Sequence, residues 1–277
     1  MMSARVLTAA VCQLHIREEA ASNLERAEAM LCAARDKGAQ LALLPEMFMC
    51  PYEPEAIRAA AEPENGPTTR RLAALASELG LLVGATVAER SGGGHIYNTG
   101  LVFAPNGDLL GRQLKNHLFD VNIPGRVCSE ESAVITPGTG VEVFAWQGLS
   151  LAVNICFDIR FPAMAREASR RGAHVLCVPA QFSAGTAPDH WELLLRARAV
   201  DYQMFVIGAN AAYDAKAAYQ SWGRSMIVDP WGDVLVRAGA GEEIIIAKLD
   251  FARLKRVRQE MPVENNRGSH AQDDGPG

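Results

Sequence analysis

Short apolar runs alternate with amphipathic segments through the N-terminal third of the chain. Three of these runs are short and rich in aliphatic side chains, which predicts buried strands at residues 5–13, 41–44 and 81–89. Two amphipathic patterns between them predict helices at residues 22–38 and 66–80. The first pattern opens with a capping box from Ser22 to Glu25 and ends at Gly38. This β-α-β-α-β order predicts a sheet with helices packed on it.

Pairs of alternating strands occupy much of the remaining chain. Three such pairs predict hairpins at residues 95–115, 141–155 and 224–238. The first turns at Pro105–Asp108 and the third at Asp229–Gly232. Because a purely parallel sheet would not contain so many hairpins, we expect an α/β fold in which two mixed sheets stack face to face with helices outside.

The other segments continue this pattern towards the C-terminus. They predict strands at residues 174–182, 204–212 and 242–250, and helices at residues 190–203 and 251–260. No linker interrupts the pattern, so residues 1–264 are expected to form one domain. Residues 265–277 are polar and rich in glycine, which predicts a flexible C-terminal tail.

Composition narrows the class of protein. The hydrophobic content of 49% allows a large core, and a net charge of −5 without a basic stripe argues against nucleic acid as a partner. The apolar runs are too short to cross a membrane, and the N-terminus lacks the basic start and cleavage site of a secretory signal. The six cysteines have no CxxC spacing, so we expect neither a metal site nor a disulfide framework, and a cytoplasmic location.

Residues 149–162 combine a strand, a turn and a helix start around one cysteine. Leu149–Ile155 is an apolar strand, Cys156 follows it directly, and Pro162 suits the first turn of a helix. A helix N-terminus favours a thiolate, so Cys156 is a candidate nucleophile. The alternative is that Cys156 is a small apolar residue at the end of a strand.

Two more ionisable residues also follow predicted strands. Glu46 comes after Pro45 at the end of residues 41–44, and Lys115 ends the strand Leu109–Leu114. Side chains at the carboxyl ends of strands meet at one edge of a sheet. A carboxylate, an ammonium and a thiol together suit acyl transfer, in which the carboxylate accepts the thiol proton and the ammonium stabilises the oxyanion. Taken singly, Glu46 and Lys115 could also be solvated loop residues.

Three stretches of the sequence resemble known motifs. The stretches LALLPEMF, GRQLKNHLFD and NICFDIRFP are similar to the signature motifs of the nitrilase superfamily of carbon–nitrogen hydrolases, and the resemblance spans about residues 4–262. It implies a four-layer α-β-β-α sandwich, a catalytic triad of Glu46, Lys115 and Cys156, and a second glutamate, for which Glu131 is a better match than Glu130. It also implies an enzyme without metal or cofactor that forms a homodimer or higher homo-oligomer.

Within the superfamily the chain is most similar to the omega-amidase branch. The matching stretches are HLFDVNIPG, CFDIRFP, DHWELLLRARAVD, AAYQSWGRS and VDPWGDVL. This likeness implies that the substrate is a small dicarboxylate monoamide such as α-ketoglutaramate, cleaved at its terminal amide through a cysteine thioester with release of ammonia. The sequence departs from the branch at Phe157, where a tyrosine is usual, and at Ala180–Phe182 and Ala187-Pro188.

The resemblance also suggests supporting residues. Glu131 would position Lys115 or the substrate amide, unless it is an exposed loop acid, and the backbone N–H of Phe157 would join Lys115 in holding the oxyanion. The substrate carboxylate needs a cationic partner. Arg160 is the first candidate, with a structural ion pair to Asp158 as the alternative. Four further residues could line the pocket: His117, Phe119, Phe182 and Thr186.

Two other functions remain open at the level of sequence. The first is hydrolysis of a longer, peptide-like amide such as deaminated glutathione, which would need a more open pocket. The second is a catalytically silent scaffold of the same fold. Intact Glu46, Lys115 and Cys156 argue against a scaffold, because a silent relative has no chemical need for all three. His117 is expected to be a structural hydrogen-bonding residue, since Glu46 already fills the role of base.

Overall fold

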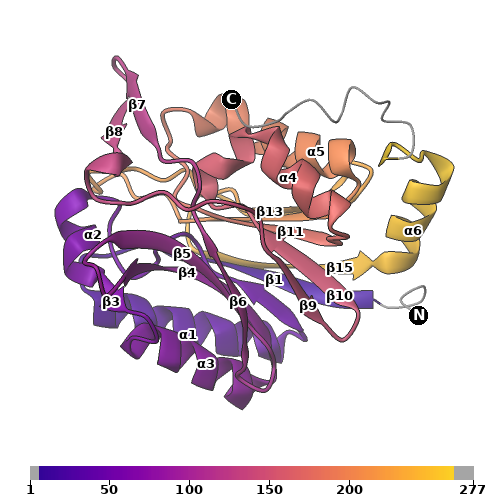
Figure 1. The fold of residues 1–277 in the computed structure, drawn as a ribbon, viewed down its shortest axis with the longest axis horizontal. Coiled ribbons are helices and arrows are strands. Elements are labelled where there is room, and N and C mark those ends of the chain that lie inside the picture. The colour runs from indigo at the N-terminus through magenta and orange to yellow at the C-terminus, as the bar shows by residue number, and fades with distance from the viewer. Residues whose placement is uncertain (1–5, 265–277) are drawn as a thin grey trace.

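The computed structural model describes residues 6–264, which form two stacked sheets with helices on both outer faces (Figure 1). The first sheet has the strand order β15-β1-β2-β4-β5-β6. Its strands are β1 (Val6–Gln13), β2 (Leu41–Leu43), β4 (Leu82–Arg90), β5 (Ile96–Phe103), β6 (Leu109–Leu114) and β15 (Glu243–Asp250), with the short β3 (Glu62–Pro63) beside β4. Strands β1, β2 and β4 are parallel, whereas β15 and the β4-β5-β6 meander add antiparallel pairs.

The second sheet repeats this mixed arrangement. Its strand order is β14-β13-β12-β11-β10-β9. The strands are β9 (Val143–Trp146), β10 (Leu149–Val153), β11 (Val175–Ala180), β12 (Phe205–Asn210), β13 (Met226–Val228) and β14 (Val234–Arg237). The three central strands are parallel and the outer pairs are antiparallel, which confirms the predicted hairpins β5–β6, β9–β10 and β13–β14.

Helices complete a four-layer α-β-β-α sandwich, as expected. Helices α1 (Ala20–Asp36) and α3 (Pro67–Leu79) cover the first sheet, and α4 (Pro162–Arg170) and α5 (Ala187–Tyr202) cover the second (Figure 1). Two further helices, α2 (Pro54–Ala60) and α6 (Phe251–Glu260), lie at opposite ends of the molecule (Figure 1). No helix of residues 6–264 is both long and apolar enough to span a bilayer.

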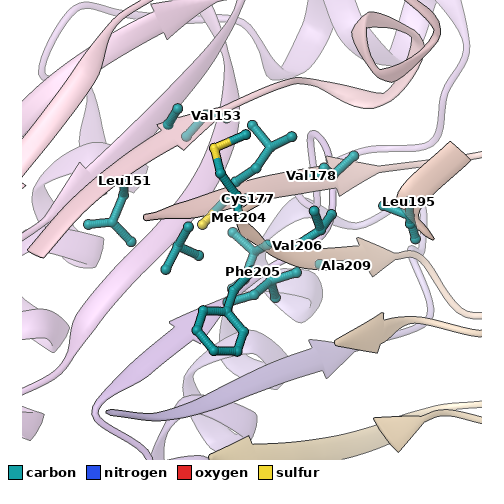
Figure 2. Close-up of a cluster of buried hydrophobic side chains, with 14 of the residues drawn as sticks. Leu151, Val153, Cys177, Val178, Leu195, Met204, Phe205, Val206 and Ala209 are labelled. Carbon is teal, nitrogen blue, oxygen red and sulfur yellow. The ribbon is translucent and has the colours of Figure 1, made fainter. Parts of the chain in front are cut away.

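Both faces of the first sheet are buried, which explains the continuous apolar run in β1. Leu7, Ala9 and Val11 pack into the core shared with the second sheet, whereas Ala10 and Cys12 pack against the helices of the other face. Figure 2 shows the core around the second sheet, where side chains of β10, β11, β12 and α5 meet.

One expectation about local structure was wrong. Helix α1 begins at Ala20, before the predicted capping box, and its N-cap Glu19 makes no side-chain hydrogen bond. Asn23 of that box is instead buried, and its side-chain amide binds the backbone of Arg17 and Met49. Four elements were also missed: α2, β3 and the antiparallel strands β7 (Asp120–Ile123) and β8 (Val127–Glu130). The predicted tail at residues 265–277 lies outside the described residues.

Candidate active site

The three predicted catalytic residues each follow the end of a strand, and their side chains lie close together. Glu46 follows β2 and Lys115 follows β6, both in the first sheet, while Cys156 follows β10 in the second. Glu46 and Lys115 are fully buried and Cys156 is 4% exposed. Ionisable groups are rarely buried without a partner, so their contacts decide what the cluster can do.

Lys115 lies between two carboxylates. Its Nζ is 2.8 Å from Glu46 Oε1 and 2.8 Å from Glu131 Oε2, and it also donates to the Tyr52 hydroxyl at 3.2 Å. Burial opposes the charged form of Lys115, but Glu131 and Glu46 outweigh it and raise the pKa above its ordinary value. Lys115 therefore remains an ammonium. Glu131 is not an exposed loop acid, since it is buried and also accepts a hydrogen bond from Phe119 N at 2.7 Å.

Three hydrogen bonds orient the Glu46 carboxylate. Oε1 accepts from Lys115 and from Asn98 Nδ2 at 2.7 Å, and Oε2 accepts from the backbone N–H of Gln181 at 2.8 Å. The side chain of Gln181 donates to the Glu46 carbonyl at 3.0 Å, which ties the end of β11 to the loop after β2. Gln181 is thus a structural link between the two sheets at the level of the site.

The backbone at the nucleophile is strained. Cys156 begins a short 3-10 helix (Cys156–Arg160), and its φ of +47° lies in the left-handed region that non-glycine residues rarely adopt. Asp158 stabilises the turn, because its carboxylate accepts from the backbone N–H of Ile155 at 3.1 Å and of His117 at 2.8 Å. The sharp turn predicted from the sequence is present, although a 3-10 helix precedes α4.

Cys156 is a thiol in the resting site, not the thiolate expected from a helix N-terminus. Burial raises its pKa well above the ordinary value, and the negative charge of Glu46 raises it further against the opposing effect of Lys115. The nearby Glu46 carboxylate thus favours the protonated form of the Cys156 thiol. Because Glu46 is a hydrogen-bond acceptor next to a protonated thiol, it can accept the proton at the moment the sulfur attacks a substrate.

Arg160 lies near this cluster, and its guanidinium packs over two aromatic rings. Its guanidinium is 5.5 Å from the ring centroid of Phe157 and 5.0 Å from that of Phe182. The guanidinium also contacts His190 Nδ1 at 3.1 Å and Thr186 Oγ1 at 3.4 Å. These contacts fix the direction of the side chain.

The Arg160 guanidinium has five N–H donors, and these two contacts do not use all of them. Within residues 6–264 its buried Nε has no hydrogen-bond partner. Burial lowers the pKa of Arg160, although the nearby Cys156 opposes this effect. The alternative of an ion pair with Asp158 is wrong, because Asp158 binds His117 Nδ1 at 2.8 Å instead.

The other predicted pocket residues divide into two groups. Phe157, Phe182 and Thr186 gather around Arg160 as described, and Phe119 packs edge-on against Phe157 with ring centroids 5.2 Å apart. His117 takes a different place, because it stacks on Phe161 at 3.6 Å and binds Asp158, so it supports the turn that carries Cys156.

Sequence reasoning missed four polar contacts of the site: Tyr52, Asn98, Gln181 and His190. A polar residue within the apolar β5 was a weak signal for Asn98. In the part of the chain that the structure describes, no cluster of His, Cys, Asp and Glu side chains is arranged to hold a metal ion.

Comparison with known proteins identifies the family. The profile of the carbon–nitrogen hydrolase family matches residues 8–259. The omega-amidase NIT2 of Xenopus tropicalis is 42% identical over 246 residues, covering 88% of this chain and 89% of that protein. The omega-amidase NIT2 of Homo sapiens is 38% identical over 255 residues, covering 92% of each chain.

A solved structure of similar shape agrees. Saccharomyces cerevisiae Nit3, described as a member of branch 10 of the nitrilase superfamily, superposes with a TM-score of 0.88 at 32% identity and covers 96% of this chain and 98% of its own. Because the family profile spans nearly the whole chain and the relatives match over nearly their full length, the protein belongs to the carbon–nitrogen hydrolase family and is an amidase of the nitrilase superfamily.

Proposed function

We propose that this amidase hydrolyses the terminal amide of small dicarboxylate monoamides, such as α-ketoglutaramate, and releases ammonia through a thioester on Cys156. The observation that supports the proposal most directly is the position of Arg160. Its guanidinium is a half-buried cation near the buried thiol, and contacts with His190 and Thr186 hold it in place. The similarity to the two omega-amidases supports the same substrate class.

The first half of the reaction forms the thioester. Glu46 accepts the thiol proton as the sulfur attacks the amide carbon, and the carbonyl oxygen becomes an oxyanion. Lys115 and the backbone N–H of Phe157 donate to that oxygen. One donor of this kind contributes about 3 kcal/mol to lowering the barrier. The protonated Glu46 then gives its proton to the departing nitrogen, which leaves as ammonia.

The second half returns the enzyme to its resting state. Glu46, again a carboxylate, accepts a proton from a water molecule as the water attacks the thioester. The resulting tetrahedral oxygen is held by the same donors. Its collapse breaks the carbon–sulfur bond, Glu46 returns the proton to the sulfur, and the carboxylic acid leaves. Glu131 keeps the Lys115 ammonium in place during both halves, since it binds Nζ at 2.8 Å.

Arg160 gives the substrate its orientation. A carboxylate at the far end of the substrate would bind N–H donors of the Arg160 guanidinium, which packs over the rings of Phe157 and Phe182. Charge-assisted hydrogen bonds of this kind are stronger than neutral ones. The cation therefore favours amides that carry a carboxylate over simple amides and nitriles.

The free thiols support a proposal for the compartment in which the enzyme works. All six cysteines are free, and Cys156 must remain reduced to act. We therefore assign the enzyme to the cytoplasm, where thiols are kept reduced.

The test is an assay of ammonia release with four substrates. We expect the purified protein to release ammonia from α-ketoglutaramate far faster than from glutamine or a simple nitrile. Deaminated glutathione is the fourth substrate. If it is the best of the four, the enzyme is the longer-amide hydrolase, and if only the nitrile reacts, the amidase proposal fails.

A further inference from the structure

The ammonium of Lys115 has three N–H bonds, and the resting site uses all of them. One points to Glu46 at 2.8 Å, one to Glu131 at 2.8 Å, and the third to the Tyr52 hydroxyl at 3.2 Å. This count matters because the proposed function, on which the present inference rests, needs an N–H of Lys115 for the oxygen of the tetrahedral intermediate. One of the three partners must give way.

The two carboxylates are poor candidates to give way. Both are buried, and removing the ammonium would leave an uncompensated charge away from water. Tyr52 is different, because its bond to Lys115 is the longest of the three and its hydroxyl carries no charge. Burial raises the pKa of Tyr52 well above its ordinary value, and Glu131 and Glu46 raise it further, so the hydroxyl keeps its proton.

The ring of Tyr52 is held in place by its neighbours. It is 6% exposed and packs against the ring of Tyr219 with centroids 4.8 Å apart. The hydroxyl of Tyr219 is in turn fixed, since it donates to the Gln181 carbonyl at 2.8 Å. The Tyr52 hydroxyl therefore contacts Lys115 from a fixed direction. It also lies close enough to Cys156 that a negative charge on the sulfur raises the pKa of Tyr52.

We propose that Tyr52 is the positioning residue for the Lys115 ammonium. In the resting enzyme its hydroxyl holds the third N–H of Lys115. The arriving oxyanion takes over that N–H, and the hydroxyl takes it back when the intermediate collapses. Without the hydroxyl the ammonium has another partner at hand, because both oxygens of Glu131 lie within 2.9 Å of Nζ. The third N–H would then turn to Glu131 and away from the reacting carbon.

Two reactions of Cys156 can distinguish a positioning role of Tyr52 from a purely structural one. Alkylation by iodoacetamide needs the thiolate but creates no oxyanion. Addition to a small aldehyde, succinic semialdehyde, forms a hemithioacetal whose oxygen lies where the oxyanion would be. We expect Tyr52→Phe to weaken binding of the aldehyde about tenfold, which is less than the roughly hundredfold effect of losing an oxyanion donor outright. The alkylation rate should be unchanged. The kcat for α-ketoglutaramate should fall by a similar factor with little change in KM.

The matched control is Tyr97→Phe, which removes the hydroxyl of a half-buried tyrosine on β5 that packs near His95. It should change neither reaction. The proposal is overturned if Tyr52→Phe binds the aldehyde as wild type does, if it slows alkylation as much as aldehyde binding, or if wild type is alkylated but binds no aldehyde. A wild type that binds the aldehyde yet hydrolyses none of the four substrates would refute the proposed function alone, because the two thiol reactions still decide the role of Tyr52.

Discussion

At the scale of single residues, the site is governed by its buried charges. Glu46 and Glu131 carry two negative charges, Lys115 carries one positive charge, and Cys156 stays neutral because its pKa is raised. A thiolate would add a third negative charge to this buried cluster, and a single lysine cannot balance three negative charges. We therefore expect the thiol proton to pass to Glu46 as the sulfur attacks, because a thiolate is not stable in the resting site.

The pH dependence of alkylation tests the state of the thiol. Because burial and Glu46 raise the pKa of Cys156, the thiolate fraction is small at neutral pH and grows as the pH rises. We expect inactivation by iodoacetamide to accelerate continuously from about pH 6 to about pH 9. A rate that reaches a plateau near neutral pH would mean that the thiolate is already formed. Mass spectrometry of the labelled peptide must locate the label on Cys156.

Arg160 gives a prediction about substrate choice. Replacing it with methionine keeps a long side chain on the rings of Phe157 and Phe182 but removes the charge. We expect KM for α-ketoglutaramate to rise about 10- to 100-fold, because a hydrogen bond to a charged group contributes about 1.5–3 kcal/mol. KM for a carboxylate-free amide should change little. The exposed Arg70→Met is the control, and equal effects on both substrates would exclude a carboxylate clamp.

At the scale of elements, the turn after β10 holds the nucleophile. Cys156 has a positive φ, and the fully buried Asp158 accepts the backbone N–H groups of Ile155 and His117. Strained backbone of this kind persists only where its surroundings enforce it. The hydrogen bonds of Asp158 therefore maintain the conformation of the site.

Removal of the Asp158 carboxylate should unfold the protein more easily. In Asp158→Ala the two backbone donors and the His117 ring lose a buried partner, at a cost of about 3 kcal/mol or more. Urea denaturation should give a correspondingly lower free energy of unfolding, and kcat should fall. Asp36→Ala, at the exposed end of α1, is the control and should stay within about 0.5 kcal/mol of wild type. Equal stability of the two variants would contradict the assigned role.

The same scale shows what the sequence could predict. The apolar runs that end in Pro45-Glu46 and Ile155-Cys156, and the alternating strand that ends in Leu114-Lys115, identify strands and the chemistry at their ends. This works because strand length and residue type are local properties. The partners Tyr52 and Asn98 are not predictable in this way. Their contacts depend on which strand lies beside which and on how closely the loops pack, and neither leaves a pattern along the chain. The failed capping box at Ser22 has a similar cause, since Asn23 is bound by residues of other segments.

At the scale of the whole molecule, three large apolar side chains are exposed together on α5 and the β13–β14 turn. Leu193 is 64% exposed, Val200 40%, and Trp231 of the turn 51%. Together with Asp189, Glu192 and Arg196 they line a groove of about 480 Å³. Apolar side chains beside charges of both signs suit a self-complementary contact, so we propose that this face pairs two copies of the chain.

A charge placed on that face should separate the copies. We expect light scattering to give the mass of a dimer or larger oligomer for wild type and a smaller mass for Leu193→Glu. Met261→Glu changes an exposed apolar residue just beyond α6 and should leave the mass unchanged. A monomeric wild type, or a Leu193→Glu variant with the wild-type mass, would exclude this interface.

The most direct test of the proposed mechanism is to trap the thioester on Cys156. Wild-type protein is mixed with α-ketoglutaramate in a single turnover, quenched with acid and digested, and the peptide containing Cys156 is weighed. We expect this peptide to carry the acyl group of the substrate, formed as ammonia is released, and a Cys156→Ala variant to form neither product. Release of ammonia by Cys156→Ala at the wild-type rate would contradict this mechanism.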